Sequence, residues 1–200
     1  MWNHNNHFHN YLLRQLPRKV NRALDIGCGL GIFAQKLAER SEFVEALDVD
    51  KAILKEASNL NSAPIICYLQ ADFLEADLSE GSYDVIVSIA SLHHMDLETA
   101  LTKMKILLCS SGKLLILGLY RETTILDYLY ASISVCLNLI YLNWHQAFIV
   151  PPTQPTTKIA PILPAQLSIG QIKTVANTLI PGFRFQRHLF WRYSLFWQKL

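Results

Sequence analysis

The sequence predicts an α/β fold built on a doubly wound, mostly parallel sheet. Two observations predict it. The first half of the chain alternates short β-branched runs with helical segments, the order that produces parallel strands covered by helices. A glycine-rich turn, DIGCGLG at 25–31, also joins the first of these strands to the first of these helices. Because 200 residues with 51% hydrophobic content suit one core, we expect residues 1–200 to form a single domain.

Five strands are expected in the first 120 residues. They are RALDI (22–26), FVEALDV (43–49), PIICYLQAD (64–72), SYDVIVSIA (82–90) and GKLLILGLY (112–120). The helices between them are expected over 33–40, 51–60 and 97–111. Five such units favour a doubly wound sheet.

The pattern changes after Tyr120. An apolar insertion over 121–150 and a proline-rich segment over 151–164 precede a helix at 167–180 and a closing hairpin of 183–190 with 193–199. Ligands of open α/β sheets bind at the carboxyl edge of the strands, so we interpret the insertion, approximately 121–164, as a helical lid over that edge.

Residues 125–144 have about the length that a membrane helix needs, which is roughly 20 residues. Asp127 and Asn138 interrupt this stretch, and such side chains are costly in hydrocarbon. We therefore expect a buried or substrate-covering helix instead of a transmembrane span. Peripheral membrane contact remains open.

The overall charge argues against a nucleic-acid partner. Eighteen basic and sixteen acidic residues leave a formal charge of +2, too small for a broad cationic face. A basic and aromatic cluster at 187–193 is expected to pack the hairpin. Four widely separated cysteines without a C-x-x-C pair read as reduced thiols, and the N-terminus lacks the features of a secretory signal. We expect a cytoplasmic protein.

The glycine turn predicts a ligand site. Glycines at 27, 29 and 31 let the backbone approach a ligand and direct N–H groups toward it, although such turns also occur for packing alone. A dinucleotide fingerprint needs glycine at position 32, where this chain has Ile32, which speaks against an NAD-dependent oxidoreductase. Asp25 suits a cationic ligand better than a pyrophosphate.

Two further acids follow the next strands. Asp48 ends the second strand, where a carboxylate can accept both hydroxyls of a ribose; its alternative role is a helix cap, for which Asp50 is the better candidate. Asp72 follows the third strand, where it can accept an exocyclic amine while Phe73 or Ala71 packs beside a purine. The alternative for Asp72 is an ordinary surface acid.

LDIGCGLG, ALDVD, LQADF and YDVIVSIASLHHM, in this order and spacing, resemble the class I S-adenosylmethionine-dependent methyltransferases, and the chain ends are similar to those of small uncharacterised bacterial members. The resemblance implies a Rossmann-like seven-stranded sheet with an antiparallel last strand. It also implies S-adenosylmethionine as cofactor and S-adenosylhomocysteine as product. The methionine end is implied at Asp25, Gly27 and Gly29, the ribose at Asp48, and the adenine at Asp72 and Phe73. The full set of expected cofactor-binding residues is Asp25, Gly27, Cys28, Gly29, Gly31, Asp48, Val49, Asp72, Phe73 and Ser88.

Methyl transfer from a sulfonium is an in-line displacement, so much of its rate can come from positioning and exclusion of water. A hydroxyl acceptor also needs a base. His93 is the preferred candidate and His94 the less favoured one, because both follow the fourth strand. The alternative is that one histidine is structural and the other lies on the surface.

The N-terminal histidines form no standard zinc pattern, so no metal is expected. We expect Trp2, His4, His7 and Tyr11 to begin a polar-aromatic helix over the cofactor mouth, with a disordered terminus as the alternative.

The acceptor is expected to be a small, apolar or lipid-like molecule. SIAS at 88–91 replaces the Asn/Asp-Pro-Pro-aromatic box of family members that methylate adenine or glutamine, and the insertion is rich in apolar side chains. Two alternatives stay open: a non-catalytic module that binds S-adenosylmethionine, and a membrane-associated enzyme acting on a lipid or quinone.

Overall fold

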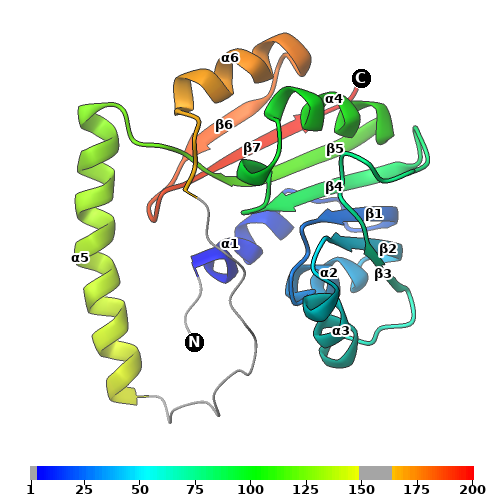
Figure 1. The fold of residues 1–200 in the computed structure, drawn as a ribbon, viewed down its shortest axis with the longest axis horizontal. Coiled ribbons are helices and arrows are strands. Elements are labelled where there is room, and N and C mark those ends of the chain that lie inside the picture. Colours follow the sequence, from blue (N-terminus) through cyan, green and yellow to red (C-terminus); the bar gives the residue numbers. More distant parts are fainter. Residues whose placement is uncertain (1–3, 149–163) are drawn as a thin grey trace.

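The fold is a single seven-stranded sheet flanked by helices (Figure 1). This computed structural model describes residues 4–148 and 164–200, and within these ranges it describes the side chains except those of 4, 136 and 138–148. The strands are β1 (Val20–Ile26), β2 (Ser41–Asp48), β3 (Ile66–Gln70), β4 (Tyr83–Ile89), β5 (Leu108–Leu119), β6 (Arg184–Arg187) and β7 (Arg192–Gln198). The helices are α1 (His4–Leu13), α2 (Ile32–Ala38), α3 (Lys51–Leu60), α4 (Leu97–Leu107), α5 (Ile125–Phe148) and α6 (Ile169–Leu179), with a short 3₁₀ helix, η1, at Leu92–His94.

The strand order is β3-β2-β1-β4-β5-β7-β6. The strands β3, β2, β1, β4 and β5 pair in parallel. β7 runs antiparallel to both of its neighbours, β5 and β6. The predicted doubly wound sheet with an antiparallel last strand is therefore confirmed. Its order changes direction between β1 and β4, which is where open α/β sheets bind ligands.

Two hydrophobic cores cover the two faces of the sheet. On one face, α4 and α6 pack through Met104 and Ile172, together with Ile86 of β4. On the other face, α1 and α2 pack through Leu12 and Leu37. The predicted N-terminal helix is thus present, and its apolar residues belong to the core on the same face as those of α2.

The helix starts follow from their caps. The Asp50 carboxylate accepts the N–H groups of Ala52 and Ile53 at the start of α3, which confirms Asp50 as the cap of that helix. Ser168 begins α6 with a capping box in which Gln171 reciprocates. Because Asp50 takes the capping role, Asp48 remains available to the glycine turn.

The helix expected over 97–111 ends four residues early. α4 stops at Leu107, and Leu108 already pairs with Tyr83 at the start of β5. The side chain of Leu108 is fully buried, and a register shift follows this pair. Burial in the sheet therefore overrides the helical pattern of the sequence in this segment.

The insertion after β5 begins with α5, which runs along one side of the molecule (Figure 1). Its first turns are fixed to the β6–β7 hairpin, because Asp127 pairs with Arg187 at 2.8 Å and the Ser134 hydroxyl accepts the N–H of Phe190 at 2.8 Å. The rest of the predicted lid, 149–163, lies outside the described residues.

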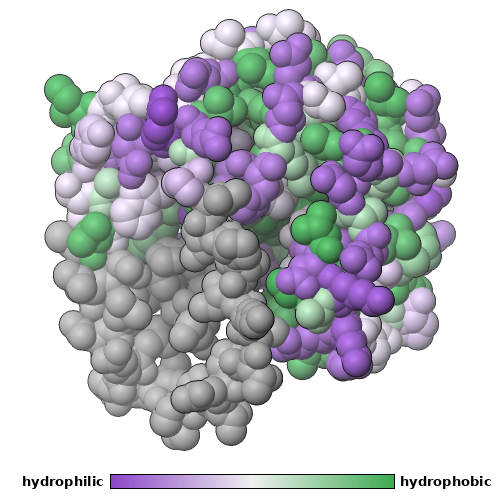
Figure 2. Space-filling view, viewed as in Figure 1, coloured by the Kyte–Doolittle hydropathy of each residue, from purple (hydrophilic) through white to green (hydrophobic). Residues whose placement is uncertain are grey.

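No helix in the described ranges has the length and apolarity needed to cross a bilayer. On the face shown in Figure 2, hydrophilic side chains spread over the described surface and apolar ones are scattered among them. Exposed large hydrophobic side chains gather on the first turns of α5, at Ile125, Leu126, Tyr128, Leu129, Ile133 and Val135.

Candidate functional site

The glycine turn between β1 and α2 has a backbone that other residues adopt only with strain. Gly27, Gly29 and Gly31 have φ values of 71°, 53° and 70°, in the left-handed region. A Cβ at Gly27 would also collide with Ser91, and one at Gly31 would collide with the hydroxyl of Tyr68. Backbone conformation therefore favours glycine at all three positions, and lack of space requires it at Gly27, against the segment after β4, and at Gly31, against β3.

Asp48, at the end of β2, is bonded to this turn. Its Oδ2 accepts the N–H of Gly29 at 2.9 Å, and its Oδ1 accepts the N–H of Asp50 at 3.0 Å. The side chain is half-buried, so part of the carboxylate still faces solvent. Each carboxylate oxygen has two acceptor positions, which leaves capacity for hydroxyl donors from a ligand.

Asp25 is the buried charge of the site. It is 1% exposed, and its Oδ2 has no hydrogen-bond partner among the described residues. Burial raises the pKa of Asp25 to about 7, and the nearby negative charge of Asp48 contributes to this increase. A hydrogen bond from the Ala34 backbone has the opposite effect and lowers the pKa. An unpaired buried carboxylate oxygen is costly, and a cationic or N–H donating ligand would relieve that cost.

A cavity of about 180 Å³ opens onto Asp25 and the turn. It is lined by Asn5, Asn6, His9, Asp25, Gly27, Cys28, Gly29, Leu30, Ile32, Phe33 and Ile89. Three of these residues come from α1, so the N-terminal helix does lie over the turn. Cys28 is a half-buried free thiol whose pKa is raised chiefly by burial, which makes it a wall of the cavity and not a nucleophile.

The residues of α1 that line the cavity differ from those expected. Trp2 lies outside the described residues, as does the side chain of His4. His7 instead packs against Phe8 and Phe190, and the Tyr11 hydroxyl donates to Gln186 at 2.8 Å. No sequence pattern indicated that Asn5, Asn6 or His9 would face the cavity, because a short helix without a clear apolar stripe does not reveal which face is turned inward.

His9 contributes a neutral imidazole to the cavity. Its ring packs edge-on against Phe33, with centroids 5.0 Å apart. Burial, with a smaller effect from Lys36, lowers the pKa of His9 to about 4. The ring is therefore uncharged at neutral pH, when it can offer one N–H donor and one acceptor.

At the far end of the site, Asp72 and Val49 lie on the surface, and Val49 is 64% exposed. The Oδ1 atom of Asp72 accepts the N–H of Leu74 at 2.8 Å, which leaves its other oxygen open. Phe73 differs from the expectation: it is 2% exposed and belongs to the core, with the ammonium of Lys103 5.4 Å from its ring centre. Its ring is thus used for packing and is not presented to a purine.

Ser88 also has a different position from the expected one. It is fully buried, and its hydroxyl is 2.7 Å from that of Ser91, which donates to the carbonyl of Ile26. Ser88 therefore contacts the end of β1 through the hydroxyl of Ser91. Ser91, which no spacing pattern singled out, is the residue in contact distance of the turn at Gly27.

The two histidines after β4 are adjacent but differ in environment. Their ring centroids are 4.0 Å apart; His93 is half-buried and His94 is exposed. Burial lowers the pKa of His93 to about 4, with further lowering by His94 and by the positive charge of Arg192. A neutral imidazole can accept a proton, but a pKa this low makes His93 a weak base.

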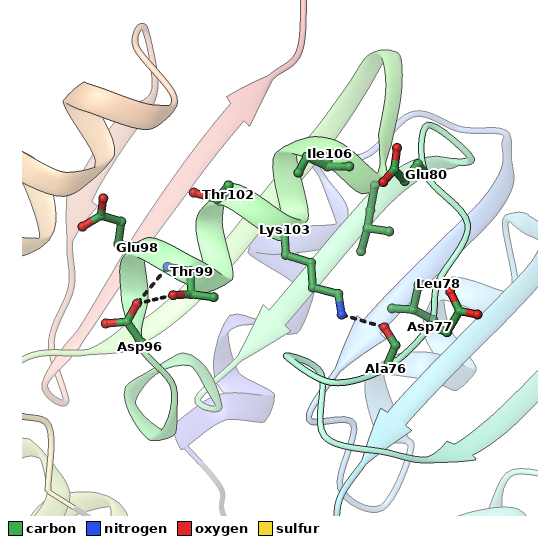
Figure 3. Close-up of a pocket in the computed structure, with 11 residues that line it drawn as sticks. Ala76, Asp77, Leu78, Glu80, Asp96, Glu98, Thr99, Thr102, Lys103 and Ile106 are labelled. Atoms are coloured by element: carbon green, nitrogen blue, oxygen red, sulfur yellow. Dashed lines mark hydrogen bonds between the residues drawn. The ribbon is translucent and has the colours of Figure 1, made fainter.

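A larger groove of about 640 Å³ lies between α4 and the segment that follows β3 (Figure 3). Its lysine and Asp96 are already hydrogen-bonded, and its other acids, Asp77, Glu80 and Glu98, are exposed. Lys103 donates to the carbonyls of Leu74 at 3.0 Å and Ala76 at 2.6 Å, and Asp96 accepts both the N–H and the hydroxyl of Thr99. We assign the functional site to the smaller cavity, because only that one contains an unpaired buried charge.

Known proteins of similar sequence include methyltransferases. Residues 24–116 match the methyltransferase domain family. An uncharacterized methyltransferase of Mycobacterium tuberculosis is 28% identical over 208 residues, which cover 98% of this chain and 96% of the relative. A malonyl-[acyl-carrier protein] O-methyltransferase of Buchnera aphidicola is 37% identical over 84 residues, 42% of this chain and 33% of that protein.

Two solved structures share the fold. A putative S-adenosylmethionine-dependent methyltransferase from Listeria monocytogenes superposes with a TM-score of 0.70 at 16% identity, covering 98% of each chain. The N-methyltransferase NodS from Bradyrhizobium japonicum, solved in complex with S-adenosylhomocysteine, gives 0.63 at 16% identity over 97% of this chain and 86% of that one.

Proposed function

We propose that this chain is a class I S-adenosylmethionine-dependent methyltransferase that transfers the methyl group of that cofactor to a small, apolar acceptor. The observation that carries this proposal is the unpaired, buried oxygen of Asp25 at the glycine turn. Bound S-adenosylmethionine supplies a methyl group on a positively charged sulfur, together with a cationic amino group. Both charges suit a site whose buried residue is an acid.

Separate residues of the site suit the methionine, ribose and adenine parts of this cofactor. Asp25 and the backbone at Gly27 and Gly29 would hold the methionine end, with Asn5 and His9 closing it from α1. Asp48 would accept the ribose hydroxyls, since its carboxylate is half-exposed and already oriented by two backbone N–H groups. These two bonds fix the side chain before any ligand arrives, which lowers the entropy cost of binding.

The adenine end would use Asp72, whose free carboxylate oxygen can accept an exocyclic amine. Val49 is exposed beside it and offers an apolar surface to the base. Phe73 supports this end only indirectly, because its ring packs in the core under Asp72.

The acceptor would bind beyond β4, next to His93. We propose that α5 covers this side and keeps water away, which protects the sulfonium and raises the effective concentration of the acceptor. If the acceptor is a hydroxyl, the neutral imidazole of His93 is the group placed to take its proton. His94 is exposed and less suited to this role.

The test is a transfer assay with methyl-labelled S-adenosylmethionine and a panel of apolar molecules that differ only in the head group: hydroxyl, amine and acid. We expect transfer to at least one of them, with turnover reduced in Asp25→Asn at subsaturating cofactor. Cofactor binding without transfer to any of these classes, or to an apolar cell extract, would instead favour a non-catalytic binding module.

A further inference from the structure

Arg192, at the start of β7, is a half-buried cation with no carboxylate partner among the described residues. The arginines Arg22 and Arg187 differ, because each pairs with an acid at 2.8 Å. Burial alone lowers the pKa of Arg192 to about 10, without an opposing effect from any nearby acid. The guanidinium nevertheless stays charged at neutral pH, so its environment holds an uncompensated positive charge.

The hydrogen bonds of this guanidinium leave one edge open. Its Nε and Nη2 both donate to Oδ1 of Asn5 at 3.0 Å, and Nη1 donates to the carbonyl of Phe190 at 3.0 Å. A guanidinium has five N–H donors, so one N–H on each terminal nitrogen has no acceptor among the described residues. These two donors, one on each terminal nitrogen, are available to the two oxygens of a carboxylate.

The turn before Arg192 is strained in a way that sets the direction of this side chain. Phe190 and Trp191 have φ values of 60° and 56°, in the left-handed region that is unfavourable for residues other than glycine. Ser134 of α5 accepts the Phe190 N–H, and Arg192 itself binds the Phe190 carbonyl. Strain that the surroundings maintain in this manner is typical of functional segments.

Arg192 lies on the side of β4 where we propose that the acceptor binds. It pairs in the sheet with Leu119, the last residue of β5, whereas Asp25 and Asp48 end β1 and β2 on the other side of β4. His93 lies between, close enough for its pKa to be affected by the charge of Arg192. Asn5 separates the guanidinium from the cavity over the glycine turn.

We propose that the methyl acceptor is an apolar molecule with a carboxylate, and that the open edge of Arg192 binds this carboxylate. The inference rests on the proposed methyltransferase function and adds the chemical class of the acceptor. A half-buried cation without a countercharge favours an acid over a neutral molecule of equal length, because only the acid supplies that charge. The anchored acid is then held beside His93, on the side of β4 opposite the cofactor residues.

Isothermal titration tests this with two probes that share a chain length, octanoate and 1-octanol, added to the complex of the full chain with S-adenosylhomocysteine at pH 7.5. We expect octanoate to bind at least tenfold more tightly than octanol to the parent protein. In Arg192→Gln the difference should fall to less than threefold, and Arg192→Lys should keep part of it because it retains charge without the fork. Circular dichroism verifies that each variant is folded.

Arg184→Gln is the matched control, since Arg184 lies on the same hairpin but is exposed. It should leave the preference for octanoate unchanged. Equal binding of the two probes to the parent, or a preference that survives in Arg192→Gln, would overturn the inference. A large loss of S-adenosylhomocysteine affinity in Arg192→Gln would also overturn it, because the guanidinium would then bind the carboxylate of the cofactor. Failure of the parent to bind S-adenosylhomocysteine would instead contradict the proposed function itself.

Discussion

The carboxylate of Asp48 accepts the backbone N–H of Gly29 at 2.9 Å, joining the end of β2 to the turn that follows β1. The bond gives one of the free N–H groups of the glycine turn a charged acceptor, and it orients the acid at the same time. A residue expected to bind ribose is therefore also part of the architecture of the turn. This dual role determines how its substitution should behave.

Asp48→Ala should weaken binding of S-adenosylhomocysteine by about 1 to 3 kcal/mol, because ribose hydroxyls would lose their acceptor and Gly29 would lose its orientation. Asp48→Asn should be milder, since the amide oxygen can still accept one of these bonds. Titration calorimetry measures both, with circular dichroism as the check on folding. Parent-like affinity in Asp48→Ala would rule out the ribose assignment.

Asp50→Ala provides the contrast. Asp50 caps α3 and is exposed, so its loss should lower the free energy of unfolding by about 1 kcal/mol without a change in cofactor affinity. Chemical denaturation and calorimetry separate the two effects. An affinity loss equal to that of Asp48→Ala would mean that the whole segment, and not the Asp48 carboxylate, holds the ligand.

Asp25 should make the stability of the free protein depend on pH. Its pKa is raised from 3.8 to about 7, chiefly by burial, so the folded state holds this proton more tightly than the unfolded state. The contribution of Asp25 to stability is therefore greatest below pH 4 and is lost as pH rises toward 7. Asp25→Asn should be more stable than the parent at pH 8 by a few kcal/mol, at about 1.4 kcal/mol per pKa unit. Thermal unfolding at pH 5 and pH 8 measures this, and an unstabilised variant at pH 8 would contradict it.

The same carboxyl group should control cofactor affinity. Only the ionised form attracts a cationic ligand, so affinity for S-adenosylmethionine should increase between pH 6 and pH 8 in the parent. In Asp25→Asn, affinity should be lower at both pH values and nearly independent of pH. Calorimetric titrations at these two values provide the measurement. A pH dependence that persists in the variant would assign it to another group.

His93→Ala should lower turnover on a hydroxyl acceptor and leave the dissociation constant of S-adenosylhomocysteine within about twofold of the parent value. The reason is its position after β4, outside the residues that line the cavity at the glycine turn. Its low pKa keeps it neutral above pH 6, so it should add no step to the pH profile between 6 and 9. Equal loss of affinity and turnover would identify His93 as a structural residue.

The ion pair of Asp127 with Arg187 should fix the start of α5. Asp127 is 1% exposed and also accepts the N–H groups of Thr123 and Thr124. Arg187→Met would leave that carboxylate without its countercharge, so we expect a stability loss of about 3 kcal/mol or more. Chymotrypsin should then cut within α5 faster than in the parent, since this helix contains Tyr and Leu but no Lys or Arg. Unchanged stability and cleavage would show that the pair does not anchor the helix.

Much of the fold follows from the order of patterns along the chain. Alternating strands and helices, the glycine turn and the closing hairpin predicted the sheet correctly. The boundary at Leu107 was missed because burial of Leu108 beside Tyr83 is a tertiary effect that helical periodicity cannot report. The two-residue repeat of a strand is visible in the sequence. The end of a helix such as α4 depends instead on where the following strand begins to pair.

The candidate site was predictable at the strand ends and less so elsewhere. Asp25 and Asp48 come together because parallel strands end at one edge of the sheet. The burial of Phe73 could not be predicted, since an aromatic residue after a strand suits a core and a ligand equally well. Asn5 and Arg192 are 187 residues apart in the sequence and meet only because α1 packs beside the hairpin.

Calorimetric titration of the purified protein with S-adenosylmethionine, S-adenosylhomocysteine and NAD tests the cofactor assignment. We expect micromolar binding of the first two and none of NAD, with affinity reduced by Asp48→Ala. Absence of binding to either S-adenosyl compound would contradict it, and would leave the glycine turn as an element of architecture alone.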